Sequence, residues 1–84
     1  MSTVDHYQVA RAFGAVLKLS RAGAQLTQEQ LAEAADIDRT YPSLMERGLR
    51  QPTLAVVLTL ADAFEIEAAT LITMTVVRLR RDQL

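Results

Sequence analysis

The stretch TQEQLAEAADIDRTYPSLMERG, residues 27–48, contains two short helical patterns separated by three or four residues. Thr27 stands directly before the first pattern, where its hydroxyl can accept a backbone N–H, and Gln30 can return the bond to form a capping box. Asp38 is placed to cap the second pattern, and Gly48 is placed to end it. The spacing predicts helices over about 28–35 and 39–47, joined by a tight turn.

Two helices joined in this way predict a helix-turn-helix, whose second helix can enter the major groove of DNA. Apolar residues at helical spacing predict three further helices, at 5–24, at about 54–65 and from about 68 onward. The β-branched run 72–77 could form a strand, and an edge strand pairing across a dimer stays open. We favour helix because a single strand has no partner within this chain. The prediction is therefore an all-α, compact five-helix bundle formed as one domain over residues 1–84.

The apolar stripes of the flanking helices predict which residues form the core. In the first helix these are Val9, Phe13, Val16, Leu17, Ser20 and Ala24. In the fourth they are Leu54, Val57, Leu58, Ala61 and Phe64, and in the fifth Ala68, Leu71, Ile72, Thr75, Val76 and Leu79. Gly14 can allow a neighbouring element to pack closely against the first helix. Pro42 and Met45 are expected to face inward, and Pro42 is easiest to accommodate if the third helix begins slightly later than Arg39.

The composition restricts the class of protein. With 84 residues the chain forms one domain, and a hydrophobic content of 50% permits a core while leaving apolar surface that dimerisation commonly covers. The chain has no cysteine, which excludes disulfides and thiolate metal sites. The single histidine, His6, is assigned no metal, and no cofactor is expected. No membrane-spanning run and no signal peptide are recognisable, so a cytoplasmic location is expected.

Several motifs, in order and spacing, resemble the XRE family of helix-turn-helix domains, which includes Cro and the phage repressors. They are Thr27-Gln28-Glu29-Gln30-Leu31-Ala32, Ile37-Asp38-Arg39-Thr40-Tyr41, Glu46-Arg47-Gly48 and Gln51-Pro52-Thr53-Leu54. The run at 38–41 is also similar to the controller proteins of restriction–modification systems. The resemblance covers about residues 13–72. It implies a lambda-repressor-like DNA-binding domain that acts as a homodimer on palindromic operators in double-stranded DNA.

The resemblance also implies roles for individual residues. Three stand at positions that touch base edges: Arg39, Thr40 and Leu44. Six stand where the family contacts the DNA backbone: Gln28, Tyr41, Ser43, Arg47, Arg50 and Gln51. Two imply a structural ion pair that ties the recognition helix to the first helix: Arg21 and Glu46. The family usually has glycine at positions 25 and 36, where this chain has Gln25 and Asp36, so both turns rely on less permissive residues.

The chemistry of the three base-edge residues differs. Arg39 can donate two hydrogen bonds to guanine, Leu44 can contact a thymine methyl group, and Thr40 can do either kind of reading. Other interpretations stay open: Arg39 as a solvated helix-surface arginine, Arg47 and Arg50 as solvated loop side chains, and Tyr41 as a core ring with a wet hydroxyl.

The net charge of −1 counts against nucleic-acid binding, because domains that bind nucleic acid are usually basic. Residues 39–51, however, contain three arginines and one glutamate, a local balance of +2. We expect a homodimer, with residues 67–84 as a C-terminal helix used in dimerisation. Its predicted interface residues are Val56, Leu60, Met74 and Val77. The alternative is that this apolar surface fills one small core.

Three functions remain after these observations. The leading one is a sequence-specific transcriptional regulator that binds a near-palindromic operator as a homodimer. The alternatives are the DNA-binding antitoxin of a toxin–antitoxin pair, with a small protein partner on its C-terminal helix, or a protein-interaction module without DNA binding. An enzyme is not expected, because no nucleophile–base set, metal cluster or phosphate-binding loop is recognisable.

Overall fold

The computed structural model describes residues 4–82, and within this range the chain forms helices without any strand. The helices are α1 (His6–Gly23), α2 (Gln28–Ala35), α3 (Tyr41–Glu46), α4 (Leu54–Phe64) and α5 (Ala68–Asp82). The all-α, five-helix prediction is therefore confirmed, and the β-branched run 72–77 is helical.

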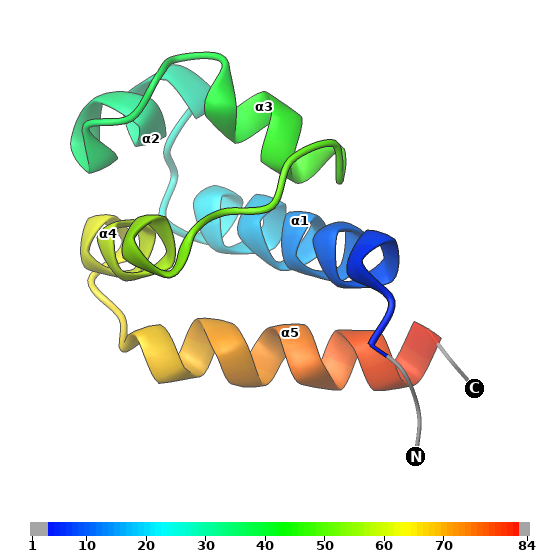
Figure 1. The fold of residues 1–84 in the computed structure, drawn as a ribbon. Coiled ribbons are helices and arrows are strands. Elements are labelled where there is room, and N and C mark those ends of the chain that lie inside the picture. Colours follow the sequence, from blue (N-terminus) through cyan, green and yellow to red (C-terminus); the bar gives the residue numbers. More distant parts are fainter. Residues whose placement is uncertain (1–3, 83–84) are drawn as a thin grey trace.

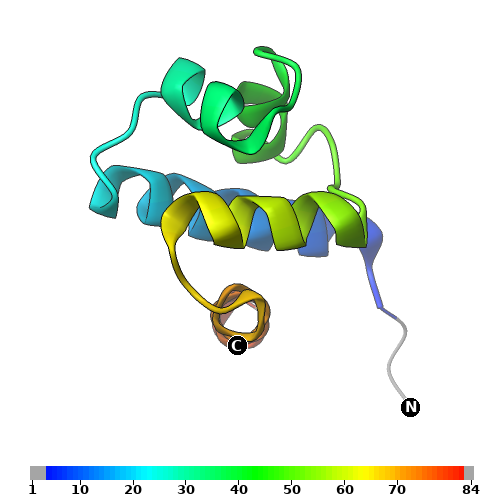
Figure 2. The same ribbon diagram turned by 90° about the vertical axis from the view of Figure 1, so that its left-hand side faces the viewer.

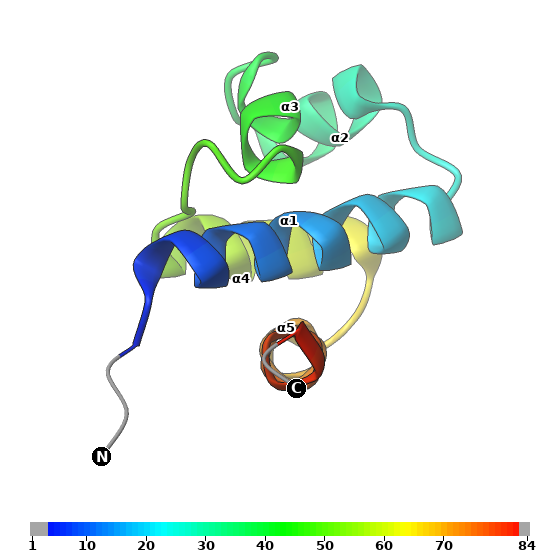
Figure 3. The same ribbon diagram turned by 90° about the vertical axis from the view of Figure 1, so that its right-hand side faces the viewer.

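Three layers make up the domain (Figure 1). The short helices α2 and α3 form the upper layer, α1 and α4 form the middle layer, and α5 lies underneath. Views from the two sides show α5 end-on below α1 and α4, so α5 crosses beneath both helices (Figures 2 and 3). The upper layer is thus carried on a platform of three longer helices.

Polar side chains begin the helices of the middle layer. The Asp5 carboxylate accepts hydrogen bonds from the backbone N–H groups of Tyr7 and Gln8 at 2.9 and 3.2 Å. The Thr53 hydroxyl accepts one from the N–H of Val56 at 3.2 Å. These bonds satisfy donors that a helix start leaves without an internal partner. The predicted limits of α1 and α4 therefore hold to within one residue at each end.

The core lies where the platform meets the upper layer. Its largest fully buried side chains are Leu17, Leu31, Met45, Leu60, Leu71 and Pro42. Pro42 and Met45 thus face inward as expected. All five helices contribute to this core, so a small chain buries one continuous apolar cluster.

Some residues predicted to lie in the core are instead exposed. On α4, Leu54 and Leu58 are 70% and 50% exposed, and on α5, Ile72 and Val76 are 45% and 37% exposed. Ala24, predicted in the stripe of α1, follows the end of that helix and is also exposed. Both α4 and α5 are apolar on more than one side, so periodicity alone could not decide which side packs inward.

Candidate nucleic-acid interface

The turn between α2 and α3 begins from a capped helix. The predicted capping box is present: the Thr27 hydroxyl accepts from the Gln30 N–H at 3.0 Å, and the Gln30 side chain accepts from the Thr27 N–H at 2.9 Å. Asp36 ends α2 in the left-handed region at φ 54°, and Gln25 before α2 has φ 61°. Both positions where the family usually has glycine therefore do adopt a conformation that favours glycine.

The start of α3 corrects the prediction. The helix begins at Tyr41 with Thr40 as its N-cap residue, rather than at Arg39 with Asp38 as cap. Asp38 instead closes a turn, because its Oδ1 accepts from the N–H of Thr40 at 2.8 Å and from the Thr40 hydroxyl at 2.6 Å. Pro42 consequently occupies the first turn of α3, where its missing N–H forfeits no helical hydrogen bond.

The predicted base-reading residues lie at and near the N-terminal end of α3. Arg39 and Thr40 are exposed, and Leu44 is half-buried. A shallow hollow of about 270 Å³ is lined by Asp38, Thr40, Tyr41, Leu44 and Arg50. The structure therefore brings two of the predicted base readers and two of the predicted backbone contacts to one surface hollow.

The hollow contains one acidic side chain, Asp38, and one arginine, Arg50. Hydrogen bonds from Thr40 hold the pKa of the Asp38 carboxyl below its ordinary value, and the charge of Arg39 contributes in the same direction. Desolvation opposes this shift without reversing it. Asp38 is therefore ionised at neutral pH and presents an acceptor-only carboxylate to Thr40.

Most of the residues predicted to contact the DNA backbone also form hydrogen bonds within the protein. The amide of Gln28 donates to Glu46 at 3.1 Å, and the Gln51 amide donates to the carbonyl of His6 at 2.8 Å. The Tyr41 hydroxyl donates to the carbonyl of Gln51 at 3.3 Å. Intramolecular bonds of this kind hold the side chains in place before any ligand arrives.

Two more residues predicted to contact the DNA backbone are Ser43, which lies on α3, and Arg47, which directly follows it. Arg47 is exposed, and its Nε donates to the carbonyl of Ser43 at 3.4 Å, while Ser43 itself is half-buried. The guanidinium of Arg47 thus lies along the last turn of α3, and its charge complements the helix C-terminus.

An ion pair joins α1 to α3 at the predicted residues. Arg21 Nε lies 2.6 Å from Glu46 Oε2, and Arg21 Nη2 donates to Oε1 at 3.1 Å. A third Arg21 nitrogen donates to the carbonyl of Leu26 at 2.9 Å. The two side chains are only 17% and 4% exposed. The hydrogen bond and charge of Glu46 raise the pKa of Arg21, so the guanidinium stays charged.

Glycine allows α3 to approach α1 closely. A Cβ atom at Gly14 would meet the carbonyl oxygens of Met45 and Glu46, the second at 2.9 Å. Gly48 follows α3 with φ 73°, and a Cβ there would meet the Arg11 side chain at 2.8 Å. Both glycines therefore set the distance between the platform and the recognition helix.

Sequence reasoning missed two contacts in this region. It did not place Gln28 against Glu46, because that contact depends on how α2 and α3 cross. It also assigned Asp38 to a helix cap. The local signal for the actual role was the spacing of Asp38 and Thr40, since aspartate commonly bonds to the backbone two residues onward in an Asx turn.

The predicted dimer residues do not form one surface. Leu60 is fully buried in the core, so its assignment to an interface was wrong. Val56 is half-buried against the core, whereas Met74 and Val77 are 36% and 60% exposed on α5. Leu60 lies on the same buried side of α4 as Val57, Ala61 and Phe64.

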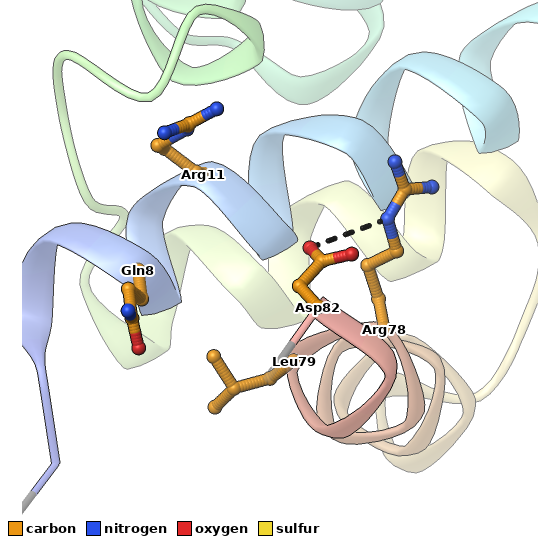
Figure 4. A pocket seen from close by; sticks show the side chains of 5 residues that line it. All are labelled: Gln8, Arg11, Arg78, Leu79 and Asp82. Atoms are coloured by element: carbon orange, nitrogen blue, oxygen red, sulfur yellow. Dashed lines mark ion pairs between the residues drawn. The ribbon is translucent and has the colours of Figure 1, made fainter. Parts of the chain in front are cut away.

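A separate polar hollow of about 390 Å³ lies between α1 and the last turns of α5 (Figure 4). Its lining residues are Gln8, Arg11, Arg78, Leu79 and Asp82. Arg78 Nε lies 3.6 Å from the Asp82 carboxylate, and Figure 4 marks this long contact with a dashed line. Arg11 instead lies beside Tyr7, with its guanidinium 5.7 Å from the ring centre. This hollow offers no nucleophile next to a general base.

Residues 4–82 also lack two other kinds of feature. No helix there is long and apolar enough to cross a membrane. The same residues contain no group of three or more histidine or acidic side chains placed to hold a metal ion.

Comparison with protein families identifies the region just described. The helix-turn-helix domain family matches residues 12–71. An uncharacterised HTH-type transcriptional regulator of Mycobacterium tuberculosis is 35% identical over 58 residues, which are 69% of this chain and 41% of that protein. The chain therefore spans less than half the length of this relative.

Solved structures show the same arrangement of helices. The restriction–modification controller protein C.AhdI of Aeromonas hydrophila is 40% identical with a TM-score of 0.77, over 81% of this chain and 99% of that chain. The controller protein C.Esp1396I, as a tetramer in complex with its natural 35 base-pair operator, is 27% identical with a TM-score of 0.76, over 84% and 93%. The clp gene regulator ClgR of Corynebacterium glutamicum shares the fold, with a TM-score of 0.83 at 24% identity over 89% and 80%.

Proposed function

The chain belongs to the XRE-like helix-turn-helix family of transcriptional regulators, and from this premise we propose that it binds a near-palindromic DNA operator as a homodimer in the cytoplasm. The observation that carries the proposal is the braced position of α3. Its N-terminal end presents Arg39 and Thr40 to solvent, while Glu46 at its other end is held by Arg21. A recognition helix needs this combination, because base contacts require a fixed orientation.

The charge around α3 supports DNA as the partner. Arg39, Arg47 and Arg50 are exposed, so their charges are available to phosphates. Glu46, the acid that offsets them in the sequence, is buried against Arg21 and contributes little repulsion. The surface near the recognition helix is therefore more basic than the net charge of −1 suggests.

A second copy is the proposed occupant of the α4–α5 apolar face, which we define as Leu54, Leu58, Ile72 and Val76. These side chains are exposed, and most of them line an apolar groove of about 300 Å³. The same groove is also lined by Gln51 and Pro52, in the loop that follows α3. A copy docked here would bring the two loops together and set both α3 helices beside them.

The dimensions of the domain are compatible with this arrangement. Half-sites one helical turn apart have centres about 34 Å from each other. The domain measures 39 × 22 × 21 Å, so two copies in contact can place their recognition helices at such a separation. Two copies would also double the phosphate contacts, which a single small domain needs for useful affinity.

A gel-shift titration on DNA from upstream of the protein's own gene, against a scrambled duplex, tests DNA recognition. Arg39→Ala should weaken binding to the specific duplex roughly 10- to 100-fold, the range of one bidentate base contact. Arg80→Ala is the matched control, because Arg80 is exposed on α5 and lies far from α3 in the chain. Equal binding of both duplexes by the unchanged protein would refute sequence-specific recognition.

Sedimentation equilibrium tests the dimer. Ile72→Glu should produce a monomer at micromolar concentration, because a charge would be buried in the apolar groove of the α4–α5 apolar face. Val77→Glu, on another side of α5, should leave the dimer intact. The reverse result would move the interface to the side carrying Met74 and Val77, as the sequence alone suggested.

A further inference from the structure

We propose that Asp38 fixes the hydrogen-bonding direction of Thr40, so that Thr40 reads an amino base, adenine or cytosine, on one strand of each half-site. This inference rests on the proposed DNA-binding function and specifies what one of its residues recognises. The observation behind it is the pair of short bonds from Thr40 to a single oxygen of Asp38, at 2.8 Å from the N–H and 2.6 Å from the hydroxyl.

The direction of the hydroxyl bond follows from the chemistry of its partner. An ionised carboxylate has no proton and can only accept, so the hydrogen between the two oxygens belongs to Thr40. The distance of 2.6 Å is typical of a charge-assisted O–H···O⁻ bond, which is stronger than a neutral one. The hydroxyl proton is therefore committed to Asp38, and only lone pairs and the methyl group of Thr40 remain for a ligand.

The backbone holds this geometry in place. The N–H of Thr40 donates to the same Oδ1 atom, which prevents the carboxylate from turning away. The N–H of Tyr41 donates to the Asp38 carbonyl at 3.0 Å, so the turn is closed on both the side-chain and the backbone oxygen. Thr40 is exposed at the N-terminal end of α3, the part of a recognition helix that contacts base edges.

An acceptor in the major groove selects bases that offer a donor. Adenine N6 and cytosine N4 carry amino groups there, whereas guanine and thymine present acceptors at the equivalent edge. Because its hydroxyl proton is donated to Asp38, Thr40 favours adenine or cytosine over guanine or thymine on the strand that it faces. A threonine without Asp38 could rotate its hydroxyl and either donate or accept.

The negative charge of Asp38 should lower the affinity for DNA, whereas its hydrogen bond with Thr40 sets the base preference. Asp38 lines the same hollow as Arg50, and Arg39 is its sequence neighbour, so its negative charge lies where the phosphates of DNA would approach. Replacing the aspartate by asparagine removes the charge but keeps an oxygen that accepts from Thr40. Replacement by alanine removes both. These two variants separate the charge effect from the hydrogen-bond effect.

Binding-site selection from a randomised duplex library, followed by sequencing, tests the proposal. The unchanged protein should enrich adenine or cytosine over guanine and thymine about 3- to 10-fold at one position of each half-site, the range of a single hydrogen bond. Thr40→Val should lose this enrichment, while Thr40→Ser should retain it because serine keeps the hydroxyl. Asp38→Asn should retain the enrichment and bind more tightly overall, and Asp38→Ala should bind with the enrichment lost.

The outcomes distinguish this inference from the proposed function. Enrichment of a defined site with no amino-base preference that depends on Thr40 would overturn the inference alone. Retention of that preference in Asp38→Ala would overturn it as well, because the hydroxyl would then be directed by something else. A failure of the unchanged protein to enrich any sequence would refute operator recognition itself. Circular dichroism melting of each variant checks that the fold is intact.

Discussion

The Arg21–Glu46 pair should respond unequally to the removal of each partner. Arg21→Met leaves the Glu46 carboxylate, which is 4% exposed, without its counter-ion. Removing one partner of a buried pair typically costs about 3–5 kcal/mol. Glu46→Gln should cost less, about 2 kcal/mol, because the amide can still accept a hydrogen bond and Arg21 can reach water at its 17% exposed edge.

The size of this effect relative to total stability makes it easy to measure. A domain of 84 residues is stable by roughly 4–13 kcal/mol, so Arg21→Met should remove a large share of that stability. In thermal melts, each kcal/mol corresponds to about 4–8 °C in Tm for a domain of this size. Urea denaturation followed by circular dichroism gives the free energy of unfolding of each variant, at low and at high salt.

A matched surface pair provides the control. Arg78 and Asp82 are separated by 3.6 Å and are 33% and 51% exposed, so Asp82→Asn should cost less than about 1 kcal/mol. The double variant Arg21→Met/Glu46→Gln should be less destabilised than the sum of these two single changes, because no unpaired charge remains. A loss below about 1 kcal/mol for Arg21→Met, or equal losses for the buried and surface pairs, would refute this reasoning.

Three further results are expected. Gly14→Ala should destabilise the protein by roughly 1–3 kcal/mol in urea denaturation, because its Cβ would meet backbone carbonyls of α3 rather than a movable side chain; unchanged stability would mean that α3 is free to shift. Gln25→Gly should raise stability by up to about 1 kcal/mol by relieving a positive φ, whereas its neighbour Ala24→Gly, at φ −84°, should lower stability in the same melts. The lowered pKa of Asp38 means that its contribution to stability is complete at neutral pH and is lost as the pH falls from about 4 through the folded-state pKa. An NMR titration of the Asp38 carboxyl measures this pKa. A pKa at or above the ordinary value of aspartate would contradict the bonds from Thr40.

Local signals in the sequence were sufficient for the helix-turn-helix. The capping pair of Thr27 and Gln30 depends only on residues three apart, and both bonds are present. The resemblance to the family, which usually has glycine at positions 25 and 36, marked two turns that do adopt positive φ. Such features are read from the chain because the atoms that cause them are neighbours in the sequence.

Which sides of the helices are buried could not be predicted from the sequence in the same way. The fourth and fifth helices are apolar on more than one side, and the sequence assigned Leu54 and Leu58 to the core and Leu60 to the surface. The structure reverses this, because Leu60 is fully buried in the core while Leu54 and Leu58 are exposed. Which side of an all-apolar helix is buried depends on the position of its neighbours.

The sequence by itself thus determined the number and kind of the helices, the turn that joins α2 to α3, and the family to which they belong. The tertiary structure alone decided the orientation of α4, the contact of Gln28 with Glu46, and the late start of α3 at Tyr41. The bond between Asp38 and Thr40 is local, and its spacing was present in the sequence although it was assigned to a helix cap. The physical reason is that hydrogen-bond capacity and periodicity are local properties of a chain, whereas the partner that a side chain meets is set by how separate helices pack together.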